Sequence, residues 1–258
     1  MSVLASEWLK VRTVRSSYLA LGLSLGGILL GIAVAWAAVG MYDSTTPERQ
    51  AHASIADLEE VVLIVPQLCM GVFGVLTITS EYATGLIRTS LAIVPRRWPV
   101  LAGKSAIVGL LGLVTGPLVV FGTYFAARWM IGDRFRGSYT TPFLDKLPTL
   151  VTSSLSVVVF ALLGLGLGAT LRSTAGAITL LVGLVYVIPI IVGNLPEPWS
   201  ERIGSVQIGA LPREITGDDL THSVYGSLLP PVAAVMVLIA YAVLPLLAGA
   251  WLMRRRDA

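Results

Sequence analysis

Six apolar stretches, each long enough to cross a lipid bilayer, constrain the fold of this chain more than any other feature. The hydrocarbon core of a bilayer is about 30 Å thick, so a spanning helix needs roughly 20 apolar residues. Lipid offers the backbone no hydrogen-bonding partner, so a stretch that crosses alone must be helical. We therefore predict an all-α polytopic membrane protein in one transmembrane domain, 1–258. Its six transmembrane helices are expected at about 18–41, 61–79, 100–127, 150–171, 174–193 and 229–253.

The composition supports this prediction and narrows the chemistry. Only 13% of the residues are charged and 55% are hydrophobic, whereas a soluble domain carries about 25% charge. The single cysteine, Cys69, excludes an intrachain disulfide, and two histidines far apart in polar segments argue against a metal site. The Gly-Lys-Ser sequence at 103–105 lacks the first glycine of a P-loop. We predict no catalytic residue, metal or cofactor in this chain, and hence no enzyme.

The distribution of Lys and Arg predicts the orientation. If both termini are cytoplasmic, the cytoplasmic segments hold eleven basic and three acidic residues, and the opposite segments hold seven basic and twelve acidic residues. The positive-inside rule then favours cytoplasmic termini. The loop 128–148 is the exception, because it carries four basic residues on the outer side.

Charged residues are missing from the centres of the predicted spans. Ion-coupled carriers usually need ionisable groups at membrane depth, so a secondary transporter is disfavoured and energy must come from elsewhere. An ion channel is disfavoured because no acidic ring or carbonyl-rich filter sequence occurs. We interpret Lys104 as an interfacial cation at the start of the third span, and Glu59 and Glu60 as acids at the outer membrane border.

Glycines recur inside the spans at a spacing of four residues. Such pairs let helix backbones approach closely in lipid. They predict either packing within the bundle or a dimer seam, and the glycines alone do not decide between them. The pairs are Gly22/Gly26, Gly27/Gly31, Gly112/Gly116 and Gly164/Gly168.

The segment 80–98 after the second span has an amphipathic pattern. At helical spacing Glu81, Thr84 and Arg88 share one face, and Tyr82 and Leu86 share another. The pattern predicts a short helix on the cytoplasmic surface with its polar groups facing outward. On this pattern alone it could equally be a simple connector.

Three parts of the chain carry a resemblance to a known family. The stretch Thr79–Leu91, followed by Pro95-Arg96-Arg97 and Lys104, resembles the coupling-helix region of type-2 ABC transporter permeases, in particular their actinobacterial branch. The opening Glu7–Ser16 and the ending Gly249–Ala258 are similar to the same family. The resemblance covers the whole chain in order and topology.

The resemblance implies the membrane subunit of an ABC exporter in a bacterial plasma membrane. A separate ATPase subunit would bind ATP and Mg, and a second permease copy would complete a homodimer or heterodimer. The interfacial helix 2–16 would lie among the lipid headgroups, no nucleic acid would be involved, and the substrate would be a drug, lipid or peptide, as in multidrug resistance. The residues expected to contact the ATPase are Glu81, Tyr82, Thr84, Gly85, Arg88, Arg96 and Arg97.

Two further interpretations stay open. The chain could instead be a membrane assembly or anchoring subunit that transports nothing. The outer loop 194–228 corresponds to a region where the family has short re-entrant helices, so it could form a substrate exit gate or a structural cap.

Overall fold

The computed structural model describes residues 3–86, 97–135, 139–216 and 229–255, and within these ranges every regular element is helical. Six of the helices are long and apolar enough to cross a membrane, which confirms the predicted all-α fold with six candidate transmembrane helices. The elements are α1 (Val3–Thr13), α2 (Arg15–Asp43), α3 (Pro47–Gln50), α4 (Leu58–Thr84), α6 (Arg97–Ile131), α7 (Phe143–Leu171), α8 (Thr174–Val182), the π-helical turn η1 (Gly183–Val187), α9 (Ile188–Gly193), α10 (Trp199–Gly204), α11 (Leu211–Thr216) and α12 (Pro231–Arg255).

Four of the six helices are longer than the apolar stretches that predicted them, and α12 has the predicted length but lies two residues further along the chain. The second predicted span, 61–79, corresponds to α4, which begins three residues earlier and ends five residues later. Polar residues continue a helix where the chain leaves an apolar core, because helical hydrogen bonding does not require an apolar side chain. The fifth span keeps its predicted bounds, with α8, η1 and α9 together covering Thr174–Gly193.

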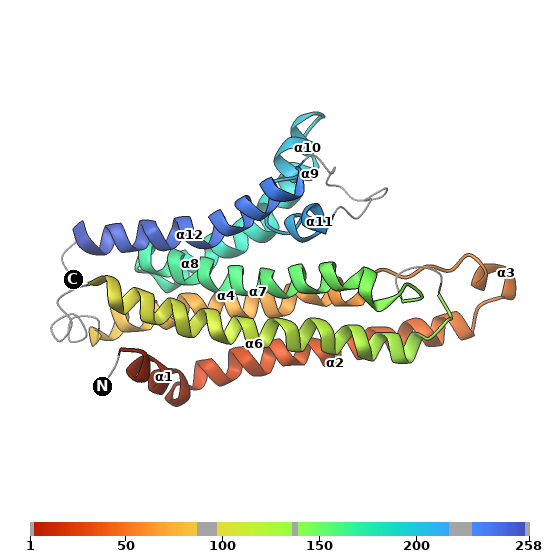
Figure 1. Ribbon diagram of the computed structural model, residues 1–258, viewed down its shortest axis with the longest axis horizontal. Helices are drawn as coiled ribbons and strands as arrows, with labels where there is room; N and C mark the ends of the chain where they lie inside the picture. The colour runs from red at the N-terminus through yellow and green to blue at the C-terminus, as the bar shows by residue number, and fades with distance from the viewer. Residues whose placement is uncertain (1–2, 87–96, 136–138, 217–228, 256–258) are drawn as a thin grey trace.

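The centre of the bundle is formed by α4 and α7. Of the most apolar stretch of α7, 72% of the residues are buried, against 17% for Thr174–Gly193 and 22% for α12. Figure 1 shows α2, α4, α6 and α7 side by side along the long axis, with α8 and α12 inclined against α7. The outer helices therefore leave most of their apolar surface uncovered by the rest of the described chain.

Glycines produce the closest helix crossings. At Gly164 in α7, an added Cβ would lie 1.9 Å from the carbonyl oxygen of Gly71 in α4, and at Gly116 in α6 it would lie 2.4 Å from that of Ser154 in α7. By contrast, a Cβ added at Gly22 on α2 would have no neighbouring atom within 4 Å. Most of the four-residue glycine pairs thus pack this bundle internally, and only Gly22/Gly26 face away from it.

A tight hairpin joins α7 to α8, as the two intervening residues predicted. Arg172 adopts a left-handed conformation (φ 52°) and ends α7, and the side chain of Ser173 accepts a hydrogen bond from the Gly176 N–H at the start of α8. Further along, the π-helical turn η1 precedes Pro189. Proline has no N–H to continue the α-helical ladder, and a local π turn is a common adjustment.

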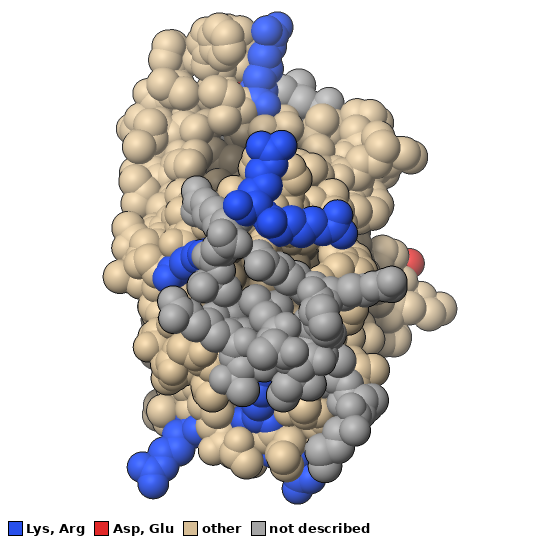
Figure 2. Space-filling model, turned by 90° about the vertical axis from the view of Figure 1, so that its left-hand side faces the viewer, with Lys and Arg blue, Asp and Glu red and all other residues tan. Residues whose placement is uncertain are grey.

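Both ends of the described chain lie at one end of the bundle. We call this the terminal end; it carries α1 and the last turn of α12, and α3 lies at the opposite, distal end (Figure 1). Figure 2 views the terminal end and shows scattered Lys and Arg with almost no acidic side chain on the described surface. The exposed basic residues there include Arg12, Arg15, Arg254 and Arg255.

Acidic partners neutralise part of the basic loop that opposed the predicted orientation. Arg134 forms an ion pair with Asp43 at 3.1 Å, and Lys146 forms one with Asp57 at 2.9 Å. Arg128 donates instead to the Tyr124 hydroxyl and to the Thr141 carbonyl. The fourth basic residue, Arg136, lies outside the described residues. The loop is therefore less positive in the folded chain than a count of its Lys and Arg suggests.

Candidate functional site

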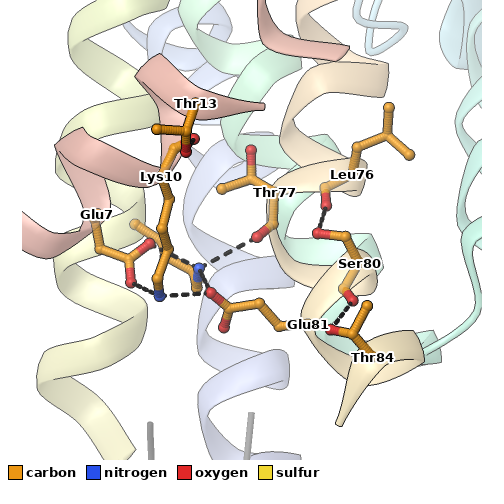
Figure 3. A network of polar contacts seen from close by, with 9 residues as sticks. Glu7, Lys10, Thr13, Leu76, Thr77, Ser80, Glu81 and Thr84 are labelled. Atoms are coloured by element: carbon orange, nitrogen blue, oxygen red, sulfur yellow. Dashed lines mark hydrogen bonds and ion pairs between the residues drawn. The ribbon is translucent and has the colours of Figure 1, made fainter. Parts of the chain in front are cut away.

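A buried cluster of two acids and two lysines joins three helices at the terminal end (Figure 3). The Lys104 ammonium of α6 contacts a carboxylate oxygen of Glu7 in α1 and one of Glu81 in α4, each at 2.7 Å. The Lys10 ammonium of α1 contacts the same two carboxylates, at 2.6 and 2.7 Å. Lys104 also donates to the Thr77 carbonyl oxygen at 3.2 Å. We call these four charged residues the ionic cluster.

The ionic cluster is isolated from solvent. Lys104 is 1% exposed, Glu7 3% and Glu81 4%, and only Lys10 reaches the surface. Two negative and two positive charges balance, so no net charge is buried. A buried charge is tolerated when it is paired and hydrogen-bonded, and removing one partner is strongly destabilising. The cluster therefore makes the position of α1 depend on α4 and α6.

Burial and pairing act on Lys10 in opposite directions. Partial burial alone would lower the pKa of its ammonium, but the hydrogen bonds and charges of Glu7 and Glu81 outweigh this, and the pKa is raised above its usual 10.5. A raised pKa means that the stabilising contribution of Lys10 is complete below the pKa of the unfolded chain. It is lost only as the pH rises through the higher folded value, well above neutrality.

The cluster lies at the base of the connection between α4 and α6. Glu81 stands one turn before the end of α4, where Gly85 adopts a left-handed conformation with φ 73° and terminates the helix. Lys104 lies in the second turn of α6, which starts at Arg97. The contact between the two side chains holds together the helices from which the segment 85–96 departs. A cavity of 140 Å³ beside the cluster is bordered by Leu86 at the start of that segment.

The structure changes the predicted roles of several residues. The expectation that Glu81 lies on an outward polar surface is wrong, because Glu81 is buried against Lys104 and Lys10. Lys104, interpreted as an interfacial cation at the start of the third span, is the most buried member of the ionic cluster. Thr84 is exposed, and its hydroxyl donates to the Ser80 carbonyl oxygen within α4.

Tyr82 and Leu86, which were expected to share one packing face, differ in the structure. Tyr82 is partly buried against the core, and the Arg172 guanidinium lies 5.1 Å from the centre of its ring. Leu86 is largely exposed. Residues 80–84 continue α4 rather than forming a separate surface helix. Of the other predicted contact residues, Arg88 and Arg96 lie outside the described residues, and the backbone of Arg97 begins α6.

Sequence reasoning did not identify Glu7, Lys10 and Lys104 as partners of Glu81. The spacing of Glu7 and Lys10, three residues apart, places both on one face of α1. Lys104 stands close to an otherwise charge-free run. A lysine beside an apolar span is usually paired with an acid. The position of Lys104 was therefore the one sign in the sequence that an acidic partner lies nearby.

A second group of polar contacts lies at the distal end. Glu59, which was interpreted as an ordinary border acid, is buried and accepts a hydrogen bond of 2.8 Å from the Tyr139 hydroxyl. Its neighbour Glu60 forms an ion pair with Arg213 of α11. Burial, and then the nearby Glu59 charge, raise the pKa of the Tyr139 hydroxyl above its usual value, so it stays a hydrogen-bond donor at neutral pH. The predicted outer loop is thus tied to the start of α4.

Comparison with known proteins adds no family assignment. No family model matches the sequence, and no curated protein matches it. Among the residues that the structure describes, no group of three or more His, Cys, Asp or Glu could hold a metal ion.

Proposed function

We propose that this chain is the membrane subunit of an ABC exporter, driven by a separate ATPase and moving a hydrophobic or amphipathic substrate. The proposal is supported by the six apolar helices, by the sequence resemblance at Thr79–Leu91, and by the ionic cluster beside that stretch. In it, the ATPase contacts the segment after Gly85 on the cytoplasmic side, and two permease copies form the pore.

The observation that carries the proposal is the buried contact between Glu81 and Lys104. A partner that moves the segment 85–96 pulls on the end of α4 and the start of α6, which this contact joins. Glu7 joins the same cluster, so the displacement also reaches α1. Charge-assisted hydrogen bonds are stronger than hydrogen bonds between neutral groups. Here they connect α4, which precedes the predicted coupling segment, with α6, which follows it. Movement of the segment would therefore move three helices together.

The orientation can be tested by labelling single cysteines in a Cys69→Ser background. We expect Arg254→Cys, at the terminal end, to resist a membrane-impermeant maleimide in intact cells, and Ser44→Cys, at the distal end, to react. Both positions are exposed in the fold, so a difference between them reports the side of the membrane. Lysed cells serve as the control, because both cysteines should then react. Labelling of Arg254→Cys from outside would reverse the predicted orientation.

The proposed ATPase contact predicts a large effect of reversing the charge of Arg88. An ATPase with a Walker A motif and an ABC signature, encoded next to this chain, is the expected partner. Like charges brought together at an interface cost several kcal/mol. We expect Arg88→Glu to weaken co-purification with that ATPase by about 30-fold or more and to abolish stimulated ATP hydrolysis.

The matched control is Arg12→Glu. This residue is exposed at the same end but belongs to α1 rather than to the segment. Both variants should insert and purify like the unmodified chain. If Arg88→Glu binds the ATPase and supports hydrolysis as Arg12→Glu does, the segment is only a connector. A complex that forms but transports nothing would favour the anchoring subunit.

A further inference from the structure

A groove of 440 Å³ runs between α8 and α12. Each of these helices packs against α7, and both lie above it in the view of Figure 1, but they make no more than marginal contact with each other. The floor of the groove includes Leu163 and Leu167 of α7. One wall includes Leu180 and Leu184, and α12 forms the other. The stretches that form the two walls are the least buried of the six candidate spans, so the groove opens among apolar surfaces that the described chain leaves uncovered.

The lining of the groove is apolar. Its one polar side-chain group is the Tyr241 hydroxyl, which donates to the Val206 carbonyl oxygen at 3.1 Å and is therefore satisfied within the protein. Along α12 the lining runs from Val237 to Pro245, about 12 Å at 1.5 Å per residue. The volume falls within the range of small-molecule sites, about 300–1,000 Å³. These properties favour an elongated apolar occupant that brings no hydrogen-bonding group.

The groove lies at the depth that a lipid tail reaches from the terminal end. Leu167 on the floor stands five residues before Arg172, about 8 Å along the helix. Pro245 stands nine residues before Arg254, about 14 Å along the helix. One leaflet of the hydrocarbon core is about 15 Å thick, half of the whole. A lipid whose headgroup lies level with these arginines therefore places the end of a tail in the groove.

One face of α12 connects the groove to the terminal end. The groove residues of α12 recur at intervals of three or four positions, and the same spacing continues to the last turn. The residues on this face are Val237, Tyr241, Leu244, Ala248, Trp251 and Arg255. Ala248 is exposed and small, so it leaves room for a chain between the groove and the last turn. There the Arg255 guanidinium lies 4.2 Å from the centre of the Trp251 ring, and both side chains are exposed.

The charge at this end of the face suits an anionic headgroup. Arg254 and Arg255 are both exposed, and Figure 2 shows almost no acidic side chain on the described surface of the terminal end. Tryptophan prefers the membrane–water interface, which places Trp251 at headgroup level. Basic residues beside membrane helices attract anionic headgroups. A zwitterionic headgroup carries its own cationic group, which the two arginines repel.

We propose that this chain binds an anionic phospholipid from the leaflet at the terminal end, with one tail in the groove between α8 and α12 and the phosphate at Arg255. The site goes beyond the proposed function. Lipid binding is a property of the chain alone and does not require the ATPase.

The test titrates the delipidated chain in detergent with phosphatidylglycerol or with phosphatidylcholine of identical tails, and native mass spectrometry measures the dissociation constant of the first bound lipid. We expect phosphatidylglycerol to bind at least 10-fold more tightly than phosphatidylcholine, because only the headgroups differ. Equal binding of the two lipids would overturn the proposal.

Filling the groove tests the position of the tail. Ala240 belongs to the lining and is partly buried, so the ring of Ala240→Phe occupies the space of the tail. Both lipids should bind at least five-fold more weakly to this variant, because they share the same tails. Ala240→Leu adds less volume and should have an intermediate effect. Ala33→Phe adds the same ring at an exposed position of α2 and should change neither affinity.

Removing the cation tests the position of the headgroup. Arg255→Gln should reduce the preference for phosphatidylglycerol to three-fold or less and leave the affinity for phosphatidylcholine unchanged. The matched control is Arg15→Gln, which removes an exposed cation at the same end from α2. This control should keep the full preference. A preference that is the same in the two variants would overturn the assignment of Arg255.

An unchanged thermal unfolding midpoint shows that a variant is folded, and Ala240→Leu carries the comparison if Ala240→Phe does not fold. Lipid binding by the folded groove variant equal to that of Ala33→Phe would show that no tail occupies the groove. If the same variant instead dissociates a dimer of the chain and lipid binding is unaltered, a second copy covers the groove, and the proposal is overturned.

Discussion

Replacing Gly164 by alanine is expected to destabilise the bundle strongly, as is replacing Gly74, where an added Cβ would lie 2.0 Å from the Ala161 carbonyl oxygen. At Gly164 the added Cβ would lie 1.9 Å from the Gly71 carbonyl oxygen and 2.8 Å from its carbonyl carbon. Both are backbone atoms of α4, so no side-chain rotation can relieve the clash, and the two central helices must separate. Overpacking of a dense core costs about 1–3 kcal/mol and sometimes more. We expect the upper end of this range, seen as a fall in the thermal unfolding midpoint of the detergent-purified chain.

Two other glycines provide graded controls for Gly164→Ala. At Gly71 the closest atom to an added Cβ is Leu181 Cδ2, at 2.7 Å, which is the far end of a flexible side chain. Gly71→Ala should therefore be milder, although it lies at the same crossing. Gly22→Ala meets nothing within 4 Å and should leave the midpoint unchanged or slightly higher. A midpoint for Gly164→Ala equal to that of Gly22→Ala would contradict the observed crossing of α4 and α7.

The six spans could be predicted because membrane insertion is a local property of sequence. Each stretch such as 18–41 is long enough and apolar enough by itself, whatever it packs against. The hairpin at Arg172 and Ser173 was predictable for the same reason, since two polar residues separate two complete spans. Helix ends were less predictable, because α4 continues through Glu81 to Thr84 and stops only where Gly85 takes a left-handed conformation.

The ionic cluster and the groove between α8 and α12 could not be predicted from local patterns. Lys104 contacts Glu7 across 97 residues of chain and Glu81 across 23 residues. Helical spacing places Glu81 on a face of its own helix, but it cannot say which other helix covers that face. The same limit applies to Leu167, one of many apolar residues of α7, whose place on the floor of the groove depends on α8 and α12.

The second large effect is expected from Lys104→Met. This change leaves the Glu7 and Glu81 carboxylates buried with only Lys10 between them, and it also removes the donor to the Thr77 carbonyl oxygen. Breaking a buried ion pair by removing one partner costs about 3–5 kcal/mol. We expect a loss of this size in the free energy of unfolding, and release of α1 from α4 and α6. Protease cleavage within α1 should become faster in the variant.

A charge-balanced double variant separates lost charge pairing from lost packing. Glu81→Gln with Lys104→Met leaves Glu7 and Lys10, one acid and one base in direct contact. The double variant should therefore be more stable than Lys104→Met alone, with a coupling energy of about 1–3 kcal/mol. The exposed pair of Arg134 and Asp43 is the control, because Arg134→Met should cost under about 1 kcal/mol.

If the two substitutions at the ionic cluster are simply additive, the four charges do not act as one network. Movement of the segment 85–96 would then not be transmitted through the pair of Glu81 and Lys104. If the double variant instead regains stability but not ATPase-stimulated turnover, the network transmits movement as well as holding the fold. A single substitution at Glu81 cannot distinguish these cases, because this buried carboxylate contributes to folding whatever partner the segment binds.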